Sequence, residues 1–252
     1  MHVLLLGASR HIGFFVAQRL LAQGHTCTLL LRRLEAMQSE SSMATYIQGG
    51  HAKLVGGDAL VRTDVQRAWD VAKGDGKVDA VFFGIGGEPT FSLTKGAVLN
   101  PPDLTSRAMS VLLDVIQSST TPADRPKLVT ITSNGLDDRT HSMLPMPMRL
   151  LYGWALRLPH EDKIEQEKNV NCATGGDGRS AGWLPIENVT IVRPAFLTDG
   201  ECKAEKKVDG YRVGAELEKV WTVSRADVGH FIAEKVFADW GKWGGNAWVV
   251  GY

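Results

Sequence analysis

The residues whose types and spacing suggest chemistry lie near the start of the chain, in the segment Gly7-Ala8-Ser9-Arg10-His11-Ile12-Gly13. An apolar run over residues 2–6 precedes this segment, and residues 14–23 carry apolar side chains at helical spacing. A strand that enters a helix through a glycine-bracketed turn presents free backbone N–H groups and the positive end of the helix dipole, which together bind a pyrophosphate. The segment therefore predicts a dinucleotide site.

The glycine pattern of this turn is incomplete. Gly7 allows the tight turn, and Gly13 allows the helix to pack closely on the sheet. The middle glycine, where the backbone approaches the pyrophosphate, is missing, because Arg10 or His11 takes its position. A plain turn with incidental glycines is the alternative, but the strand before the turn and the helix after it favour the dinucleotide site.

Two arginines follow the second expected strand, which spans residues 26–31. This position reads the adenosine ribose: an acidic residue would bind the 2′-OH of NAD, whereas a guanidinium suits a 2′-phosphate. Arg32, with help from Arg10, is therefore predicted to bind the 2′-phosphate of NADP(H). For Arg33, a solvated position at the start of a helix is an equal alternative.

Strand and helix signals alternate along the chain, which is typical of an α/β fold with a doubly wound, mostly parallel sheet of Rossmann type. Glycine-rich or hydroxyl-rich segments follow several strands, at the edge of the sheet where such folds bind ligands. A flexible loop is expected at 173–182. Further strands are predicted at 52–55, 79–83, 127–132, 189–192 and 247–250, and further helices at 61–72, 103–118, 161–169 and 224–237.

Length and composition limit the class of protein. The 252 residues fit a single domain, 44% of them are hydrophobic, and 28 basic residues balance 28 acidic ones, which gives no reason to expect a nucleic-acid partner. No apolar run approaches the roughly 18 residues that a membrane span needs, and a strand at residue 2 leaves no room for a signal peptide. Three widely spaced cysteines predict a reducing compartment, the cytoplasm by default, and no metal site.

Five ordered segments resemble the short-chain dehydrogenase/reductase superfamily, and most closely its atypical branch of NmrA-like and flavin (biliverdin B) reductase-like proteins. Residues 7–13 are similar to the loop Gly-Ala-Ser-Arg-Gly-Ile-Gly, and 29–33 resemble an NADP-binding Val-Leu-Val-Arg segment. Residues 57–58 resemble a Gly-Asp pair at the adenine. Residues 190–200 resemble the Arg-Pro-Gly-x-Leu-x-x-Gly region beside the nicotinamide, and 224–228 resemble a Ser-Arg-x-Asp-Val helix start.

The resemblance implies NADP(H) as the cofactor and assigns residues to its two halves. The loop at 7–13 would hold the pyrophosphate, Asp58 would meet the adenine, and Lys163 would lie at the nicotinamide half. The implied cofactor-binding residues are Gly7, Ser9, Arg10, His11, Ile12, Gly13, Arg32, Arg33, Asp58, Ala59, Gly84, Ile85, Gly86, Ser133, Lys163, Pro194, Ala195 and Phe196.

The resemblance also implies a catalytic pair, Ser133 and Lys163, but the usual tyrosine is missing. Classical members of the superfamily carry Tyr-x-x-x-Lys on one helix, with the tyrosine donating or accepting the proton at the carbonyl oxygen. Here Pro159 stands four residues before Lys163, and Tyr152 is followed at the lysine spacing by Leu156.

Each candidate has an ordinary structural alternative. Ser133 could satisfy a loop amide, Lys163 could pair on the surface with Glu167, and Tyr152 is expected to be a packing residue. His160 could relay a proton, although a lone histidine is usually not catalytic.

Three segments are predicted to cap the site, at about 87–104, 141–160 and 197–222. The second is rich in methionine, leucine and aromatic residues, which suits an apolar acceptor but equally a core helix or a homodimer contact. The leading hypothesis is an NADPH-dependent reductase that acts on a small or medium conjugated or aromatic carbonyl-type acceptor. The alternative is an NmrA-type regulatory protein that senses NADP(H) and binds a protein partner without turnover.

Overall fold

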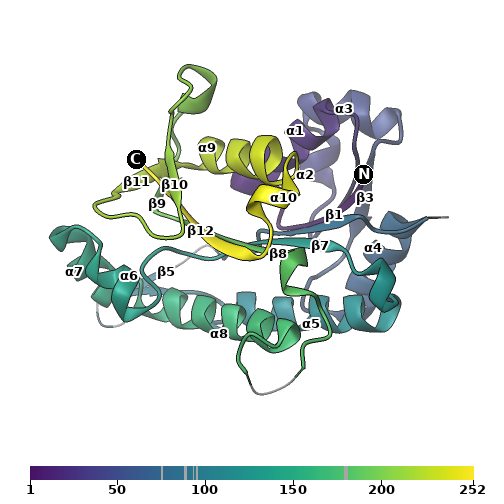
Figure 1. The fold of residues 1–252 in the computed structure, drawn as a ribbon. Coiled ribbons are helices and arrows are strands. Elements are labelled where there is room, and N and C mark those ends of the chain that lie inside the picture. The colour runs from purple at the N-terminus through teal and green to yellow at the C-terminus, as the bar shows by residue number, and fades with distance from the viewer. Residues whose placement is uncertain (75, 88–89, 93, 95, 179–180) are drawn as a thin grey trace.

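The computed structural model describes the chain except for residues 75, 88–89, 93, 95 and 179–180. Within the described residues, eight strands form a central sheet in the order β10-β12-β8-β7-β4-β1-β2-β3 (Figure 1). Neighbouring strands pair in parallel, and β10, at one edge, runs antiparallel to β12. The strands are β1 His2–Leu6, β2 Thr26–Leu31, β3 Ala52–Gly56, β4 Ala80–Phe83, β7 Lys127–Ile131, β8 Val189–Pro194, β10 Arg212–Gly214 and β12 Asn246–Gly251.

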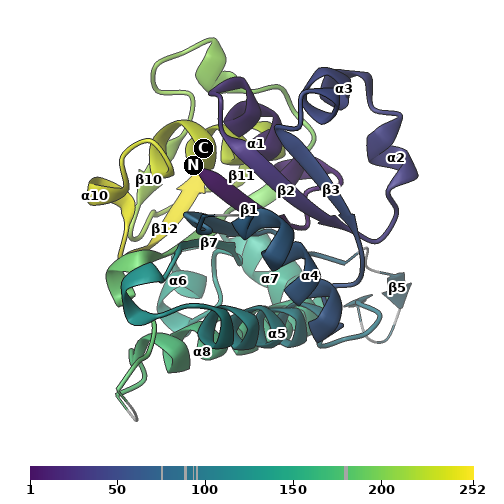
Figure 2. The same cartoon turned by 90° about the vertical axis from the view of Figure 1, so that its right-hand side faces the viewer.

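Helices cover both faces of the sheet (Figure 2), because its strands are apolar on both sides. Alternate residues of β1 show this: Val3 and Leu5 pack into one hydrophobic cluster, and Leu4 and Leu6 pack into the other. The first cluster includes residues of α1 His11–Ala22, α2 Glu35–Gln38, α3 Ser41–Gln48, α9 Arg225–His230 and the π-helix Phe231–Val236 that continues α9. The second includes residues of α4 Arg62–Lys73, α5 Leu104–Ser119 and α8 Arg157–Thr174.

The predicted elements agree closely with this sheet. The seven strands expected from apolar runs are its parallel strands, with ends that differ by at most two residues. The predicted helix at 161–169 is longer, since α8 spans Arg157–Thr174 and takes in the first two residues of the loop expected at 173–182. Of that loop, residues 179–180 lie outside the described part of the chain.

The three segments that the sequence predicts to cap the site follow β4, β7 and β8 in the chain (Figure 1). The Lys219 N–H donates to the carbonyl of Met143 at 3.2 Å, so the second and third segments are in contact. The first segment, 87–104, is only partly described, because residues 88–89, 93 and 95 are excepted. The elements in or next to these segments are β5 Thr90–Ser92, β6 Gly96–Val98, α6 Asp138–Ser142, α7 Met146–Ala155, β9 Phe196–Thr198 and β11 Thr222–Ser224. The short helix α10 Trp240–Trp243 precedes β12.

Two features of the described residues concern membrane insertion and metal binding. No helix among them is both long and apolar enough to cross a membrane. They also contain no group of three or more His, Cys, Asp or Glu side chains arranged to hold a metal ion.

Candidate functional site

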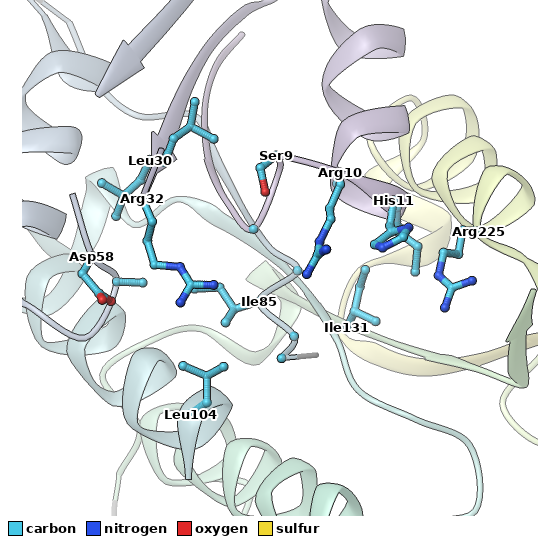
Figure 3. Close-up of a pocket in the computed structure, with 18 of the residues that line it drawn as sticks. Ser9, Arg10, His11, Leu30, Arg32, Asp58, Ile85, Leu104, Ile131 and Arg225 are labelled. Carbon is cyan, nitrogen blue, oxygen red and sulfur yellow. The ribbon is translucent and has the colours of Figure 1, made fainter. Parts of the chain in front are cut away.

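A pocket of about 520 Å³ lies across the carboxyl ends of β1, β2, β3, β4 and β7 (Figure 3). This is the edge at which a doubly wound sheet binds its ligand, because the loops after its strands converge there. Fourteen of the predicted site residues line the pocket: Gly7, Ser9, Arg10, His11, Ile12, Gly13, Arg32, Arg33, Asp58, Ala59, Gly84, Ile85, Gly86 and Lys163. It is also lined by Leu30, Leu31, Ala36, Gly57, Gly87, Leu104, Ile131, Thr132, Leu197 and Arg225, which the sequence did not single out as site residues.

The two glycines of the first loop are required by close backbone contacts. Gly7 has a φ of +85°, and a Cβ there would lie 2.5 Å from the carbonyl carbon of Gly84. A Cβ on Gly13 would lie 2.2 Å from the carbonyl oxygen of Gly7. The turn after β1 is therefore held tightly against both α1 and the segment after β4.

His11 occupies the place of the missing glycine and still adopts a conformation that favours glycine. Its φ is +56°, in the left-handed region that side chains other than those of Gly, Asn, Asp and His rarely adopt. The residue before it, Arg10, is extended with a φ of −163° and precedes the first turn of α1. The loop thus keeps the path of a glycine-rich turn while carrying a side chain at its middle position.

The charge of the pocket lining is mainly positive. Arg10, Arg32, Arg33, Lys163 and Arg225 all line it, whereas Asp58 is the one acidic residue among the described lining residues. Figure 3 shows Arg32 on the same side of the pocket as Asp58, with Arg10 nearer its middle. A cleft with this charge attracts an anionic ligand with several negative groups.

Asp58 is held in place by its own loop. Its Oδ1 accepts a hydrogen bond from the Leu60 N–H at 2.9 Å, and its backbone N–H donates to Asp64 at 2.8 Å. That bond from the Asp58 backbone lowers the pKa of the Asp64 carboxyl, with further lowering by Arg67. The carboxylate of Asp58 is thus held at the pocket by hydrogen bonds within its own loop.

Lys163 of α8 lines the pocket. Its Nζ donates to the carbonyls of Ile85 and Ile131, at 3.2 and 3.1 Å, and to Oε1 of Gln166 at 2.9 Å. Burial lowers the pKa of Lys163 to about 8, although Asp162 and Glu167 act in the opposite direction. The ammonium group therefore connects the ends of β4 and β7 at the pocket.

Glu167 does not serve as the surface partner of Lys163 that the alternative assignment supposed. Its carboxylate accepts hydrogen bonds from the guanidinium of Arg193 and from Thr132 Oγ1, the latter at 2.6 Å. Lys163 and Glu167, four residues apart on α8, thus belong to different hydrogen-bond networks.

Ser133 is absent from the described lining of the pocket, although its neighbour Thr132 belongs to it. The Ser133 Oγ lies 3.2 Å from Nε2 of His160, and the ring of Tyr152 stands edge-on to that of His160 at 4.9 Å. Burial lowers the pKa of His160 to about 4, with contributions from His141 and Lys163, and burial raises the pKa of Tyr152 to about 12. These three side chains form a polar cluster next to the pocket, since Ser133 follows the lining residue Thr132 in the chain.

Pro194, Ala195 and Phe196 are also absent from the described lining, in contrast to the sequence prediction. The cause is sheet pairing: β8 continues through Pro194, the Ala195 N–H donates to the Val250 carbonyl, and Phe196 begins β9. Ala195 is buried in the core as a result. From this segment, Leu197 contributes to the pocket instead.

Comparisons with known proteins agree with this geometry. A family model described as NAD(P)H-binding matches residues 7–239. The chain is 26% identical over 224 residues to "Reductase pytE" of Aspergillus terreus, a match that covers 85% of this chain and 83% of that protein. It is 31% identical over 132 residues to "Oxidase pynE" of Aspergillus niger, with coverage of 50% of this chain and 43% of that protein.

Solved structures share the fold. An anaerobillin reductase, ChuY, from Escherichia coli O157:H7 superposes with a TM-score of 0.64 at 18% identity and covers 98% of this chain and 95% of its own. A putative NAD-dependent epimerase/dehydratase from Bacillus halodurans gives 0.64 at 19% identity, with coverage of 99% and 92%. At these identities the likeness concerns the Rossmann-type architecture alone.

Proposed function

Because the chain belongs to the NAD(P)H-binding family, we propose that it is an NADPH-dependent reductase. Its acceptor would be a small or medium molecule with a conjugated or aromatic carbonyl-type group. The observation that carries the cofactor choice is the guanidinium of Arg32 at the end of β2, on the Asp58 side of the pocket (Figure 3). A planar guanidinium binds a phosphate through two parallel charge-assisted hydrogen bonds, whereas NADH offers only a hydroxyl there.

The pocket residues fit the remaining parts of the cofactor. The loop between β1 and α1 would hold the pyrophosphate on its backbone N–H groups, because the glycines keep the turn close to the sheet. Asp58 would receive the adenine, and Gly84, Ile85 and Lys163 would lie along the nicotinamide half. NADPH would supply the hydride, so the protein must mainly bind, orient and exclude water.

One polar group, the Ser133 hydroxyl, remains for the acceptor, because Lys163 would belong to the cofactor. Lys163 would hold the nicotinamide half from below, since its position is fixed by the carbonyls of Ile85 and Ile131. The Ser133 hydroxyl, which is paired with His160 and follows the pocket residue Thr132 in the chain, would face the acceptor oxygen. A conjugated acceptor can take its proton from solvent, so the missing tyrosine does not prevent turnover.

A regulatory protein that binds NADP(H) without turnover is the second candidate. It is favoured by Pro159 at the position of the usual tyrosine and by Tyr152, which is buried against His160 rather than placed in the pocket. Such a protein would respond to the NADP(H) state and bind a protein partner or a second copy of itself. The reductase is preferred because the relative that spans most of this chain is named a reductase.

The experiment that separates the two candidates is NADPH oxidation, followed at the absorbance of the reduced nicotinamide, over quinones, flavins, enones and aldehydes. We expect turnover with at least one conjugated or aromatic acceptor. Tight NADPH binding without oxidation across the whole panel would favour the regulatory protein.

We place the reaction in the cytosol, in keeping with three widely spaced cysteines and their reducing compartment.

A further inference from the structure

Arg225 lines the pocket although no part of the motif analysis gave it a ligand. It is the first residue of α9, and its side chain lies beside His11 on the opposite side of the pocket from Asp58 and Arg32 (Figure 3). Both Arg225 and His11 approach the same carboxylate oxygen, Oδ1 of Asp199, at 2.6 and 3.9 Å. The fold thus places the guanidinium of Arg225 beside the turn that contains His11, although the two residues are far apart in the sequence.

The position of Arg225 is fixed by the elements around it. Ser224 caps α9, since its Oγ accepts a hydrogen bond from the Asp227 N–H at 2.9 Å. The Asp227 carboxylate in turn accepts from the Tyr252 hydroxyl at 2.6 Å and from the Ala204 N–H at 2.9 Å. A Cβ on Gly229 would lie 2.6 Å from the Phe15 Cβ, so α9 packs closely on α1. The start of α9 is therefore held against the start of α1.

The partner of Arg225 in this structure is a weak competitor for it. The Asp199 side chain is 77% exposed, whereas that of Arg225 is 24% exposed. An ion pair with an exposed carboxylate contributes little, because water and salt screen it and the side chain loses freedom. A phosphate in the partly enclosed pocket would also accept charge-assisted hydrogen bonds from the same guanidinium, and solvent would screen that contact less.

A positive charge near the middle of the loop would compensate for the missing glycine. A glycine there would let the backbone approach the pyrophosphate, but residue 11 carries an imidazole instead. We propose that Arg225 binds the pyrophosphate of the cofactor at its nicotinamide-side phosphate, and that Asp199 holds the guanidinium until the phosphate replaces it. This inference rests on the proposed function, because it concerns the same cofactor.

The proposal predicts opposite effects for the two members of the ion pair. We expect Arg225→Gln to weaken both NADPH and NADH by about 10-fold, which corresponds to about 1.4 kcal/mol, because the two cofactors share the pyrophosphate. Asp199→Asn, which removes the competing carboxylate, should leave the affinity for NADPH unchanged or raise it by a few-fold. A purely structural ion pair would instead make both substitutions weaken binding alike.

Titration calorimetry with NADPH, NADH and adenosine 2′,5′-bisphosphate tests this. The bisphosphate carries the 2′-phosphate and the adenosine-side phosphate but lacks the nicotinamide-side phosphate, so Arg225→Gln should leave its affinity within about twofold of the native value. Arg139→Gln is the matched control, because Arg139 pairs with Glu216 at 2.8 Å on the surface and is absent from the described pocket lining. We expect this variant to bind NADPH like the native protein.

The possible outcomes distinguish a failure of the Arg225 proposal from a failure of the proposed function. If the native protein binds NADPH and Arg225→Gln binds it equally well, the inference is wrong while the proposed function stands. An equal loss of the bisphosphate and of NADPH would also overturn the inference, since the effect would then lie elsewhere in the site. If the native protein binds neither NADPH nor NADH, the proposed function itself fails.

Discussion

Arg32 is the residue on which the choice between NADPH and NADH depends. We expect Arg32→Glu to weaken NADPH by about 100-fold or more, because a charge-assisted contact of roughly 1.5–3 kcal/mol becomes a repulsion, and to change NADH little. Parallel calorimetric titrations with both cofactors measure this, with Arg32→Gln as the neutral comparison. An equal loss for the two cofactors would mean that Arg32 does not read the 2′-phosphate.

His160 should make the stability of the protein depend on pH. Its pKa in the folded chain is lowered to about 4 from an ordinary 6.5. Between these values the unfolded chain binds a proton that the folded chain does not. The free energy of unfolding should therefore fall as the pH falls from 6.5 to 4, with a slope from this group of up to about 1.4 kcal/mol per pH unit.

The variant His160→Gln isolates this effect, because it removes the titrating group. Urea unfolding at several pH values between 4 and 7.5 should give a flatter dependence for His160→Gln than for the native protein. The exposed His51 supplies the control, since His51→Gln should keep the native slope. A native slope in the His160 variant would show that the imidazole titrates normally in the folded chain.

At the scale of elements, α5 and α8 are joined by a buried carboxylate. Asp162 of α8 accepts hydrogen bonds from the Thr105 and Ser106 N–H groups at 2.8 and 2.9 Å, and from the Thr105 hydroxyl at 2.7 Å. It therefore satisfies the first turn of α5, whose N–H groups have no partner within the helix. The same residue precedes Lys163, so this contact also helps to hold the lysine in the pocket.

We expect Asp162→Ala to lower the free energy of unfolding by about 2–3 kcal/mol, because buried N–H groups at the start of α5 lose their acceptor. Equilibrium unfolding in urea measures the change. Asp114→Ala, on the exposed side of α5, should cost no more than about 0.5 kcal/mol. Similar small losses for both variants would contradict the capping role of Asp162.

Among the strands, those that the sequence predicted are longer than those that it missed. The seven parallel strands were predictable because each is a run of apolar residues bounded by turn signals, as at Ala80–Phe83. The three-residue strands β5, β6, β9, β10 and β11 are too short to show a periodic pattern. The start of α8 was placed too late because Pro159 interrupts the pattern, although proline is tolerated in the first turn of a helix.

At the scale of the whole molecule, the packing of the elements determined which residues of the site could be predicted from local sequence motifs. Residues 7–13 and Arg32 follow their strands directly, so local motifs predicted that they would meet at one edge. Arg225 belongs to the same pocket only because α9 packs on α1 more than 200 positions earlier in the chain. Pro194–Phe196 were assigned to the pocket by resemblance, but they pair with β12 and β11 and are absent from the described pocket lining.

The contact between Gly7 and the segment after β4 constrains how this chain can vary. The space beside Gly7 is filled by backbone atoms, namely the carbonyl group of Gly84 and the nitrogen of Ile85. Trimming a neighbouring side chain would create no room there, so a substitution at Gly7 should have no second-site suppressor at 84 or 85. A selection for revertants of Gly7→Ala should therefore return glycine at that codon, whereas defects at sites bounded by side chains can be repaired elsewhere.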